Sequence, residues 1–207
     1  MTGGVRFIQP CCPIRAKDPP AGDGWLHELK IDGYRLQVVK SGRQVRLYSR
    51  RGNDWTQRMP VLVDALAALP TPTVVLDAEL FLPGTDGTPN FYGLQAAISA
   101  RQHELAIFAF DILHKDGIDL RPLQLVQRKL ALTSLIERSK IPCLKVVQSF
   151  PDGTELLASA ERLGLEGVDS KRRSAPYRSG ECRDWRNTKT DAWREANRER
   201  GRLFERS

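Results

Sequence analysis

The sequence predicts an α+β fold, and three of its properties support this class. Segments in which apolar and polar residues alternate, typical of strands, recur along the chain. Segments with apolar residues at helical spacing lie among them, but helices and strands do not alternate strictly as in a parallel α/β protein. The length of 207 residues suits one globular domain, and 41% hydrophobic with 28% charged residues is the composition of a folded chain.

The first elements expected are an arm and a set of strands. Residues 1–24 are rich in Pro, Gly and Cys, and PPAGDG directly before Trp25 is turn chemistry, so an extended arm is expected. Roughly alternating apolar and polar residues then predict antiparallel strands over 25–30, 34–40 and 45–50, with a hairpin turn at SGRQ.

Helices and further strands follow in the middle of the chain. Residues 59–70 carry apolar side chains at helical spacing between two prolines, and residues 91–99 predict another short helix. Between them, residues 73–82 are a strand candidate that stops at the turn-rich PGTDGTP. Residues 105–113 are so dense in apolar side chains that this strand is expected to be buried on both faces.

The last third of the chain predicts the longest helix. It covers residues 121–139, with Pro122 at a plausible first helical position and leucines at i, i+3 and i+4 spacings. A strand over 144–150 is expected next. Asp152 or Thr154 can then cap one more helix.

Composition argues against several classes of protein. No apolar run is long enough to span a bilayer and the first residues lack the pattern of an export signal, so a cytoplasmic protein with no membrane partner is expected. The four cysteines show no CxxC spacing and there are only three histidines, so a zinc site is not indicated. Residues 191–207 are charged nearly throughout and are expected to be a helical or frayed tail.

The net charge of +7 is concentrated in one segment. Residues 171–189 carry seven Lys and Arg against two acids, a balance that suits a polyanionic partner such as nucleic acid. A solvated basic surface is the alternative interpretation. The candidate nucleic-acid-binding residues are Arg172, Arg173, Arg178 and Arg183.

A series of short motifs carries the chemistry. KIDGYR matches the pattern KxDGxR and begins at Lys30. Each motif alone is weak, and their order and spacing are what indicate a function. The others are SRRG (49–52), LDAEL (76–80), FAFDIL (108–113), EGVDSKR (166–172) and RDWRNTK (183–189).

These motifs resemble those of the covalent nucleotidyltransferases, which include ATP-dependent DNA ligases, RNA ligases and mRNA capping enzymes. The likeness is strongest to the adenylation domain of bacterial ATP-dependent DNA ligases that act in end joining and other repair. It runs from about Phe7 to Lys189 and includes PPAGDGWLHELKIDGYR, SRRGNDWTQRMP and SAPYRSGECRDW. The resemblance implies an adenylation domain over residues 25–190, with antiparallel sheets flanked by helices and a nucleotide groove between the sheets.

The resemblance makes Lys30 a nucleophile that takes AMP from ATP. A free lysine has a pKa near 10.4, so on the order of one in a thousand is a neutral amine at neutral pH. We expect Arg35 and Lys171 to lie close by and to penalise the ammonium form. Lys171 and Lys189 resemble the catalytic pair that neutralises charge on the α-phosphate.

Further roles follow from the same resemblance. Arg35 and Arg50 are similar to phosphate and ribose contacts, and Phe110 to the ring stacked on adenine, with Phe108 as the alternative. Taken singly, each of these residues could instead be a surface charge or a core aromatic. The implied nucleotide-binding residues are Glu28, Arg35, Arg50, Glu79, Phe110 and Lys171, and the implied ligands for Mg²⁺ or Mn²⁺ are Glu79 and Glu166.

The sequence departs from the family pattern at three positions. Ala78 replaces a usual glycine, Asp169 replaces an apolar residue and shares a strand face with Lys171, and Asn187 replaces one of two lysines. Family ligases also continue into an OB-fold, where this chain has a short tail, so weak self-adenylation is expected. Nicked double-stranded DNA is the expected partner, with a separate OB-fold or repair protein as a further one. A non-catalytic or degenerate nucleotide- or DNA-binding module and an RNA ligase are the alternatives.

Overall fold

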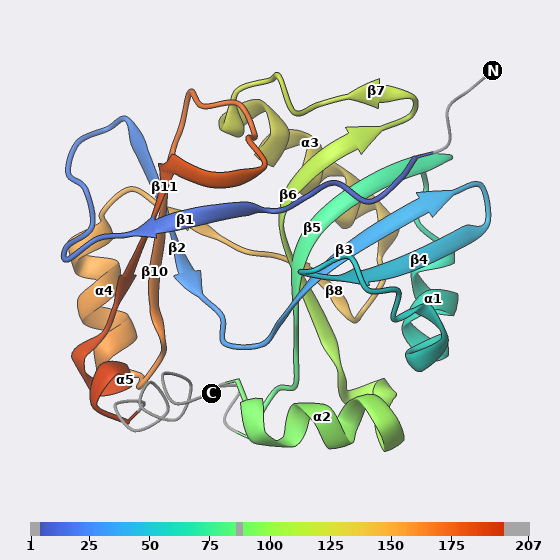
Figure 1. The fold of residues 1–207 in the computed structure, drawn as a ribbon, viewed down its shortest axis with the longest axis horizontal. Coiled ribbons are helices and arrows are strands. Elements are labelled where there is room, and N and C mark those ends of the chain that lie inside the picture. The colour runs from blue at the N-terminus through green and yellow to red at the C-terminus, as the bar shows by residue number, and fades with distance from the viewer. Residues whose placement is uncertain (1–4, 86–88, 197–207) are drawn as a thin grey trace.

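Two mixed β-sheets form the framework of the computed structural model, which describes residues 5–85 and 89–196 (Figure 1). Within these residues, neighbouring strands are antiparallel except for the pairs β1–β11 and β6–β8. Sheet A has the order β1 (Cys11–Arg15), β11 (Gly180–Lys189), β10 (Gly167–Arg172), β2 (Trp25–Lys30) and β9 (Ser149–Phe150). Sheet B has the order β4 (Gln44–Ser49), β3 (Tyr34–Ser41), β5 (Thr73–Phe81), β6 (Ala106–Lys115) and β7 (Ile118–Asp119), and β8 (Leu144–Val146) also pairs with β6. The predicted α+β class is confirmed.

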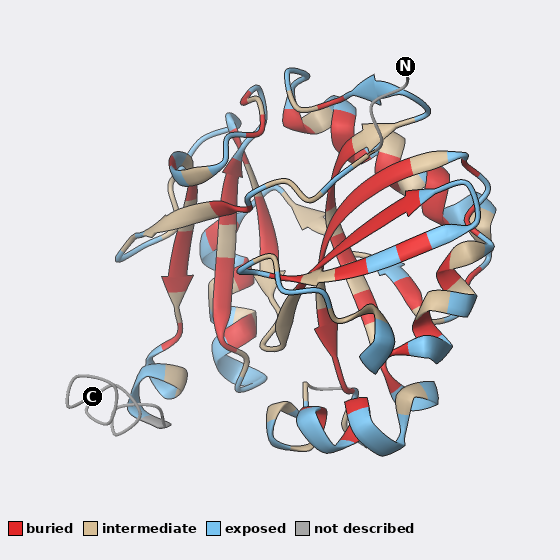
Figure 2. Ribbon diagram, turned by 45° about the vertical axis from the view of Figure 1, so that its right-hand side comes forward, coloured by how far each residue is buried: buried red, intermediate tan, exposed pale blue. Residues whose placement is uncertain are grey.

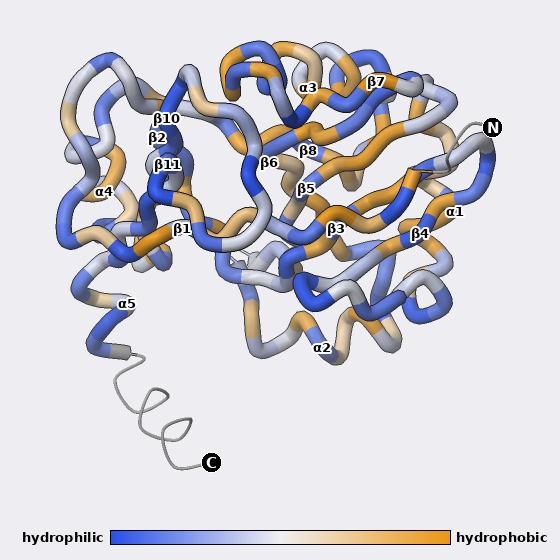
Figure 3. Tube along the Cα trace, turned by 45° about the horizontal axis from the view of Figure 1, so that its top comes forward, coloured by the Kyte–Doolittle hydropathy of each residue, from blue (hydrophilic) through white to orange (hydrophobic). Residues whose placement is uncertain are grey.

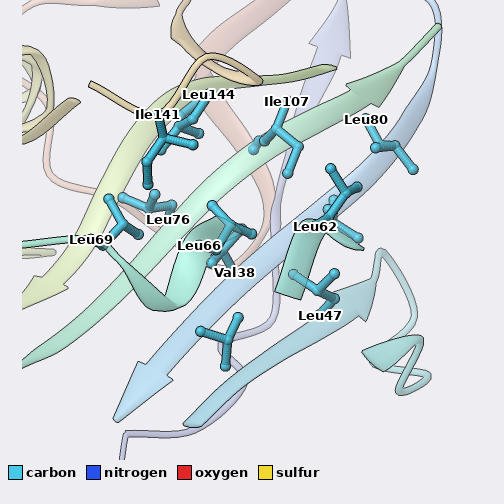
Figure 4. Packing of buried hydrophobic residues seen from close by; sticks show 14 of the residues in the cluster. Val38, Leu47, Leu62, Leu66, Leu69, Leu76, Leu80, Ile107, Ile141 and Leu144 are labelled. Atoms are coloured by element: carbon cyan, nitrogen blue, oxygen red, sulfur yellow. The ribbon is translucent and has the colours of Figure 1, made fainter. Parts of the chain in front are cut away.

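The main hydrophobic core lies on sheet B. Leucine and valine side chains of β3, β4 and β5 pack against α1 (Pro60–Ala67), and each is almost fully buried (Figure 4). Burying one such side chain stabilises the fold by roughly 1.5–3 kcal/mol. Helix α2 (Phe91–Ala100) packs at one end of the sheet, and α3 (Leu125–Ser139) packs on β6. The strands carry most of the buried residues, whereas the helices keep exposed outer faces (Figure 2).

Sheet A is the more polar of the two sheets. Strands β10 and β11 are largely hydrophilic along their length, whereas β5 of sheet B is largely hydrophobic (Figure 3). Helix α4 (Gly153–Arg162) covers one face of β10 and β2. The opposite face of sheet A is therefore where polar side chains gather.

The predicted strand over 144–150 is wrong as a single element. The chain passes from sheet B to sheet A within it, so that β8 pairs with β6 and β9 pairs with β2. Val147 lies at the crossing, is buried, and donates its backbone N–H to the carbonyl of Ala109 at 2.9 Å. A regular alternation of apolar and polar residues cannot show that the partner sheet changes.

Two boundaries in the sequence prediction need correction. Helix α3 begins at Leu125 rather than near Pro122, because Gln124 and Gln127 form a capping box that fixes the first turn. Burial of β6 on both faces holds only for Asp111–Leu113. In its first half, Phe108 and Phe110 are half-buried while Ile107 and Ala109, which alternate with them, are buried. At the other predicted cap, Asp152 accepts hydrogen bonds from two backbone N–H groups and is the N-cap of α4.

The segment predicted to be an arm links the two sheets. Residues 11–15 form β1, which pairs in parallel with β11. Before it, Ile8 exchanges two backbone hydrogen bonds with the Gln37 side chain at 2.7 and 2.8 Å, and Phe7 packs on Tyr48 of β4. The arm therefore contacts sheet B first and then becomes the edge strand of sheet A.

At the other end, α5 (Asp191–Ala196) forms the start of the predicted tail, and residues 197–207 lie outside the described residues. The predicted division into an arm over 1–24, a domain over 25–190 and a tail over 191–207 stays a prediction. None of the helices in the described part of the chain is long and apolar enough to cross a bilayer.

Candidate active site

A groove of about 1180 Å³ lies between the two sheets. Sheet A contributes side chains from β1, β2, β10 and β11, and sheet B contributes side chains from β3, β5 and β6. Eight of the residues proposed from the sequence line it: Glu28, Lys30, Arg35, Arg50, Glu79, Phe110, Glu166 and Lys171. Residues 136 positions apart in the sequence, such as Lys30 and Glu166, meet here because β2 and β10 are adjacent.

Lys30, Glu166 and Lys189 form one cluster. The Nζ of Lys30 lies 3.2 Å from Oε2 of Glu166, and the Nζ of Lys189 lies 3.0 Å from Oε1 of the same carboxylate. Gly167 is paired with both lysines, one on each neighbouring strand. A Cβ at Gly167 would lie 2.1 Å from the carbonyl oxygen of Thr188, so only glycine lets the strands approach this closely.

The Lys30 ammonium is stabilised in the free protein, contrary to the sequence prediction. Burial lowers the pKa of Lys30, but the carboxylates of Asp169 and Glu166 outweigh burial and raise the pKa above its ordinary value, and Glu79 adds to them when it is ionised. The Lys30 side chain remains 26% exposed, so it stays open to the groove. Before Lys30 can act as a nucleophile it has to lose a proton that the neighbouring negative charges help to hold on its amine.

Arg35 and Lys171 do not act on Lys30 as predicted, because each has its own carboxylate. Arg35 donates two hydrogen bonds to Asp77, at 2.7 and 2.6 Å. Lys171 donates to Glu28 at 2.5 Å. Each positive charge is thereby largely neutralised by its own carboxylate partner.

Glu79 faces Lys30 from sheet B. Burial raises the pKa of Glu79 to about 8, and the neighbouring charges of Lys30 and Arg35 offset only part of this effect. Glu166 and Asp169 act in the same direction as burial because like charges disfavour ionisation. Glu79 is therefore largely protonated at neutral pH in the free protein.

The glycine of KIDGYR is explained by a close backbone contact. Gly33 lies in the connection from β2 to β3, and a Cβ there would lie 2.2 Å from the carbonyl oxygen of Leu80. The connection can therefore lie against β5, where Arg35 is paired with Glu79. This places Lys30 and Arg35 on opposite sheets but in the same groove.

Two aromatic side chains also line the groove. Phe110 and Trp185 pack edge to face with ring centroids 6.0 Å apart, and both line the groove. The Nζ of Lys171 lies 4.4 Å from the Phe110 centroid and 4.1 Å from the Trp185 centroid. Phe108, the alternative ring, packs on Phe81 instead and is not among the residues that line the groove.

Glu28 is held by two lysines. Its carboxylate is 1% exposed and lies 2.5 Å from Lys171 Nζ and 2.6 Å from Lys129 Nζ. Burial raises the pKa of Glu28, but the two ammonium groups outweigh burial and lower it. Lys129 comes from α3 and was missed by the sequence reasoning. The signal available was its position four residues after Leu125, on the same helix face as that leucine.

Two more buried acids support the site and were also missed. Asp77 accepts hydrogen bonds from Arg35 and from the Tyr177 hydroxyl at 2.6 Å. Asp111 forms a bidentate ion pair with Arg128 at 2.8 and 2.9 Å, with both side chains fully buried. Asp77 and Asp111 lie in β5 and β6, two segments rich in apolar residues, and the sequence gives no indication of which cation each acid would pair with.

The departures from the family pattern have structural consequences. Asp169 accepts a hydrogen bond from Asn187 Nδ2 at 2.8 Å, across paired positions of β10 and β11. Ala78 is fully buried in β5, and its φ is not positive, so the missing glycine does not distort the strand. Asp169 does lie on the groove face with Lys171, as its spacing predicts.

The four arginines proposed to bind nucleic acid lie outside the groove. Arg172, Arg173, Arg178 and Arg183 are all exposed. Arg172 pairs with Asp184 at 3.3 Å and stacks on Trp25. Arg50 lies at the groove and is exposed, with its Nη2 at 3.5 Å from Cys12 Sγ.

Glu79 and Glu166 could provide part of a metal site. Within residues 5–85 and 89–196, no three His, Cys, Asp or Glu side chains converge closely enough to hold a metal ion by themselves. Two carboxylates completed by substrate phosphates are a usual set for Mg²⁺, so the residues present fit that ion only together with a nucleotide.

The two sheets and the lysine-containing groove between them define the adenylation domain of a nucleotidyltransferase. The chain belongs to the ATP-dependent DNA ligase domain family, whose pattern matches residues 16–189. It is 40% identical over 181 residues to the multifunctional non-homologous end joining protein LigD of Pseudomonas aeruginosa, which covers 86% of this chain and 21% of that protein. It is 33% identical over 188 residues to a probable DNA ligase of a Nocardioides species, covering 86% of this chain and 37% of the relative.

Solved structures agree with this assignment. A mycobacterial DNA ligase D in complex with ATP superposes with a TM-score of 0.76 at 31% identity, over 87% of this chain and 59% of that one. The adenylate of Chlorella virus DNA ligase shares the fold, with a TM-score of 0.63 at 18% identity over 88% of this chain and 69% of that one. The predicted adenylation-domain fold is confirmed. The chain spans about a fifth to somewhat over a third of the length of these two curated relatives.

Proposed function

We propose that this chain is the adenylyltransferase unit of an ATP-dependent DNA ligase, with Lys30 as the residue that carries AMP. The observation that supports this most directly is the Lys30–Glu166–Lys189 cluster at 3.2 and 3.0 Å in a groove between two sheets. Aromatic side chains, cations and carboxylates all line the groove, which suits a base and a polyphosphate. The ligase family and the ATP complex of a related structure support ATP as the nucleotide.

The first step is attack of the neutral Lys30 amine on the α-phosphorus of ATP. A P–N bond forms, the bond from the α-phosphorus to the bridging oxygen breaks, and pyrophosphate leaves with that electron pair. The proton lost by Lys30 has a carboxylate acceptor in Glu166 at 3.2 Å. Lys189, whose Nζ lies 3.0 Å from Oε1 of Glu166, would balance charge on the α-phosphate while the bond forms.

The next two steps transfer AMP and seal the nick. An oxygen of the 5′-phosphate at a DNA nick attacks the phosphorus of lysyl-AMP, and the P–N bond breaks so that Lys30 is regenerated. The 3′-hydroxyl then attacks the activated 5′-phosphorus, and AMP leaves. The DNA backbone carries one negative charge on each phosphate. The residues proposed to bind it are the exposed Arg172, Arg173, Arg178 and Arg183.

Divalent metal and a further domain complete the proposal. Mg²⁺ or Mn²⁺ held by Glu79, Glu166 and the nucleotide would supply positive charge that compensates the phosphates. An OB-fold or a repair protein is proposed as a further partner of this unit. We expect the protein in the cytoplasm, where its proposed DNA substrate would also be.

The test is covalent labelling. Incubation of the purified chain with ATP labelled on the α-phosphate, with Mg²⁺ or Mn²⁺, should add one AMP detectable by mass spectrometry. Lys30→Ala should remove the label, whereas Lys145→Ala, at an exposed lysine of β8, should leave it unchanged. Absence of label on the wild-type chain under every metal condition would contradict catalysis by this chain alone.

A degenerate binding module is the second candidate, and a specific observation favours it. The carboxylates of Asp169 and Glu166 keep the Lys30 ammonium charged, and Asn187 contributes no positive charge. In that case nucleotide and DNA would bind without label, and Lys30→Ala would bind them as well as the wild type. An RNA ligase would be distinguished by a preference for nicked RNA over nicked DNA at a pre-adenylated nick.

A further inference from the structure

We propose that Arg15 of β1 is a phosphate-binding residue of the groove and supplies the positive charge that Asn187 lacks. This inference rests on the proposed function for the identity of the ligand, a nucleoside triphosphate. Arg15 belongs to the segment that the sequence indicated only as an extended arm. Its position beside Asn187 appears only when β1 joins sheet A.

Four groove residues lie in one row across sheet A. Glu28 of β2 is paired with Asp169 of β10, Asp169 with Asn187 of β11, and Asn187 with Arg15 of β1. All four side chains line the groove. The row therefore runs from two acids through a neutral amide to a single arginine at the edge of the sheet.

Asn187 has no positive charge to offer a phosphate, and one of its two amide N–H groups is already engaged. Its Nδ2 donates to Asp169 at 2.8 Å. Glu28 is balanced by Lys129 and Lys171, at 2.6 and 2.5 Å, but Asp169 has no ion pair with any residue that the structure describes. A phosphate placed beside this row meets the Asp169 carboxylate, whose charge acts on Lys30 but has no ion-pair partner within the row. Arg15 is the cation next along the row.

The backbone fixes Arg15 while its side chain stays available. Residue 16 donates its N–H to the carbonyl of Asn187 at 2.9 Å, and the β1–β11 pairing continues on the other side. The Arg15 side chain is exposed and makes no ion pair within the described parts of the chain. Burial lowers the pKa of Lys189, and the charges of Lys30 and Arg15 add to this effect, so the Arg15 charge reaches the Lys30 cluster. A guanidinium binds oxyanions through two parallel N–H groups, which suits a flexible triphosphate.

Equilibrium binding provides the test, because it does not depend on catalysis. ATP and adenosine are titrated calorimetrically into the intact chain carrying Lys30→Ala, with and without Arg15→Ala. Arg15→Ala should weaken ATP binding about tenfold, the effect of losing one charged hydrogen-bond partner, and should leave adenosine binding unchanged. The matched control is Arg43→Ala, at an exposed arginine in the β3–β4 turn, which should change neither.

Rescue separates the proposed role from a structural one. Asp169→Val with Asn187→Lys restores the family pattern and should recover most of the ATP affinity lost with Arg15→Ala. Thermal unfolding of each variant checks that β1 remains in place. Equal ATP affinity for the Arg15 and Arg43 variants would overturn the inference, as would equal loss of ATP and adenosine binding.

The remaining outcomes distinguish this inference from the proposed function. If the wild-type chain binds ATP but forms no lysyl-AMP, the proposed catalysis fails while the Arg15 result still stands or falls on ATP affinity. If Arg15→Ala leaves ATP binding intact but slows sealing of a pre-adenylated nick, Arg15 contacts DNA phosphate, and its assignment to the nucleotide is overturned. A wild-type chain that binds no ATP would overturn both.

Discussion

The Nζ of Lys30, the last residue of β2, lies 3.2 Å from Oε2 of Glu166, which directly precedes β10. This pairing predicts that Lys30→Arg removes AMP labelling completely, because a guanidinium is not a nucleophile at neutral pH, while the ion pair with Glu166 is kept. Thermal unfolding should therefore match that of the wild type, and mass spectrometry should show no added AMP. Residual labelling of this variant would show that another residue is the acceptor.

Glu166 should be needed for metal-dependent labelling. Glu166→Gln keeps the size of the side chain but removes the charge that faces Lys30 and Lys189, and one proposed metal ligand. Single-turnover labelling should slow at least about tenfold, with a higher Mg²⁺ concentration needed for half-maximal rate. Glu155→Gln, at an exposed position of α4, should have no effect on either value. An unchanged Mg²⁺ dependence for Glu166→Gln would remove it from the metal site.

Glu79 should make the stability of the metal-free protein depend on pH. Its pKa is raised by burial from 4.5 to about 8 in the folded protein. Between these two values the unfolded chain releases its proton while the folded protein retains it, so stability falls as the pH rises through this window. Urea unfolding in the presence of a chelator, followed between about pH 5 and pH 9, should show this loss, and Glu79→Gln should flatten it. Parallel profiles for the two proteins would contradict the assignment.

Phe110 should contribute to adenine binding and Phe108 should not. Phe110 lines the groove, whereas Phe108 packs on Phe81 away from it. Loss of one stacking ring costs roughly 1–3 kcal/mol, so Phe110→Ala should weaken ATP binding about tenfold or more. Phe108→Ala is the matched control: it should lower the unfolding temperature but leave ATP affinity close to that of the wild type. The reverse pattern would identify Phe108 as the stacked ring.

The buried Asp111–Arg128 pair should dominate stability in a way that surface pairs do not. Asp111→Asn leaves the Arg128 guanidinium buried without its counter-charge and should cost about 3–5 kcal/mol in urea unfolding. Asp119→Asn breaks the similar pair with Arg121 on the surface and should cost less than about 1 kcal/mol. Similar losses for the two variants would show that burial does not determine the worth of these pairs.

The motif series predicted much of the groove from the sequence. Lys30, Glu79, Glu166 and Phe110 were proposed from the motif series and its resemblance to the nucleotidyltransferases, and the structure brings all four to one groove. Local patterns also predicted most strands and helices, since alternation and helical spacing are set by which face of each element is buried. The strand over 144–150 was mistaken because its alternation is the same whichever sheet pairs with it.

What the sequence by itself determined was the family, the α+β class and the choice of Lys30 as the candidate nucleophile. What only the tertiary structure decided was the electrostatic setting of that lysine and the partners of its neighbours. Lys129 reaches Glu28 from α3, Asp77 neutralises Arg35, and Arg15 comes to lie beside Asn187. The reason is physical: charge interactions depend on distance and burial in space, and residues far apart in the chain acquire both only when the two sheets come together.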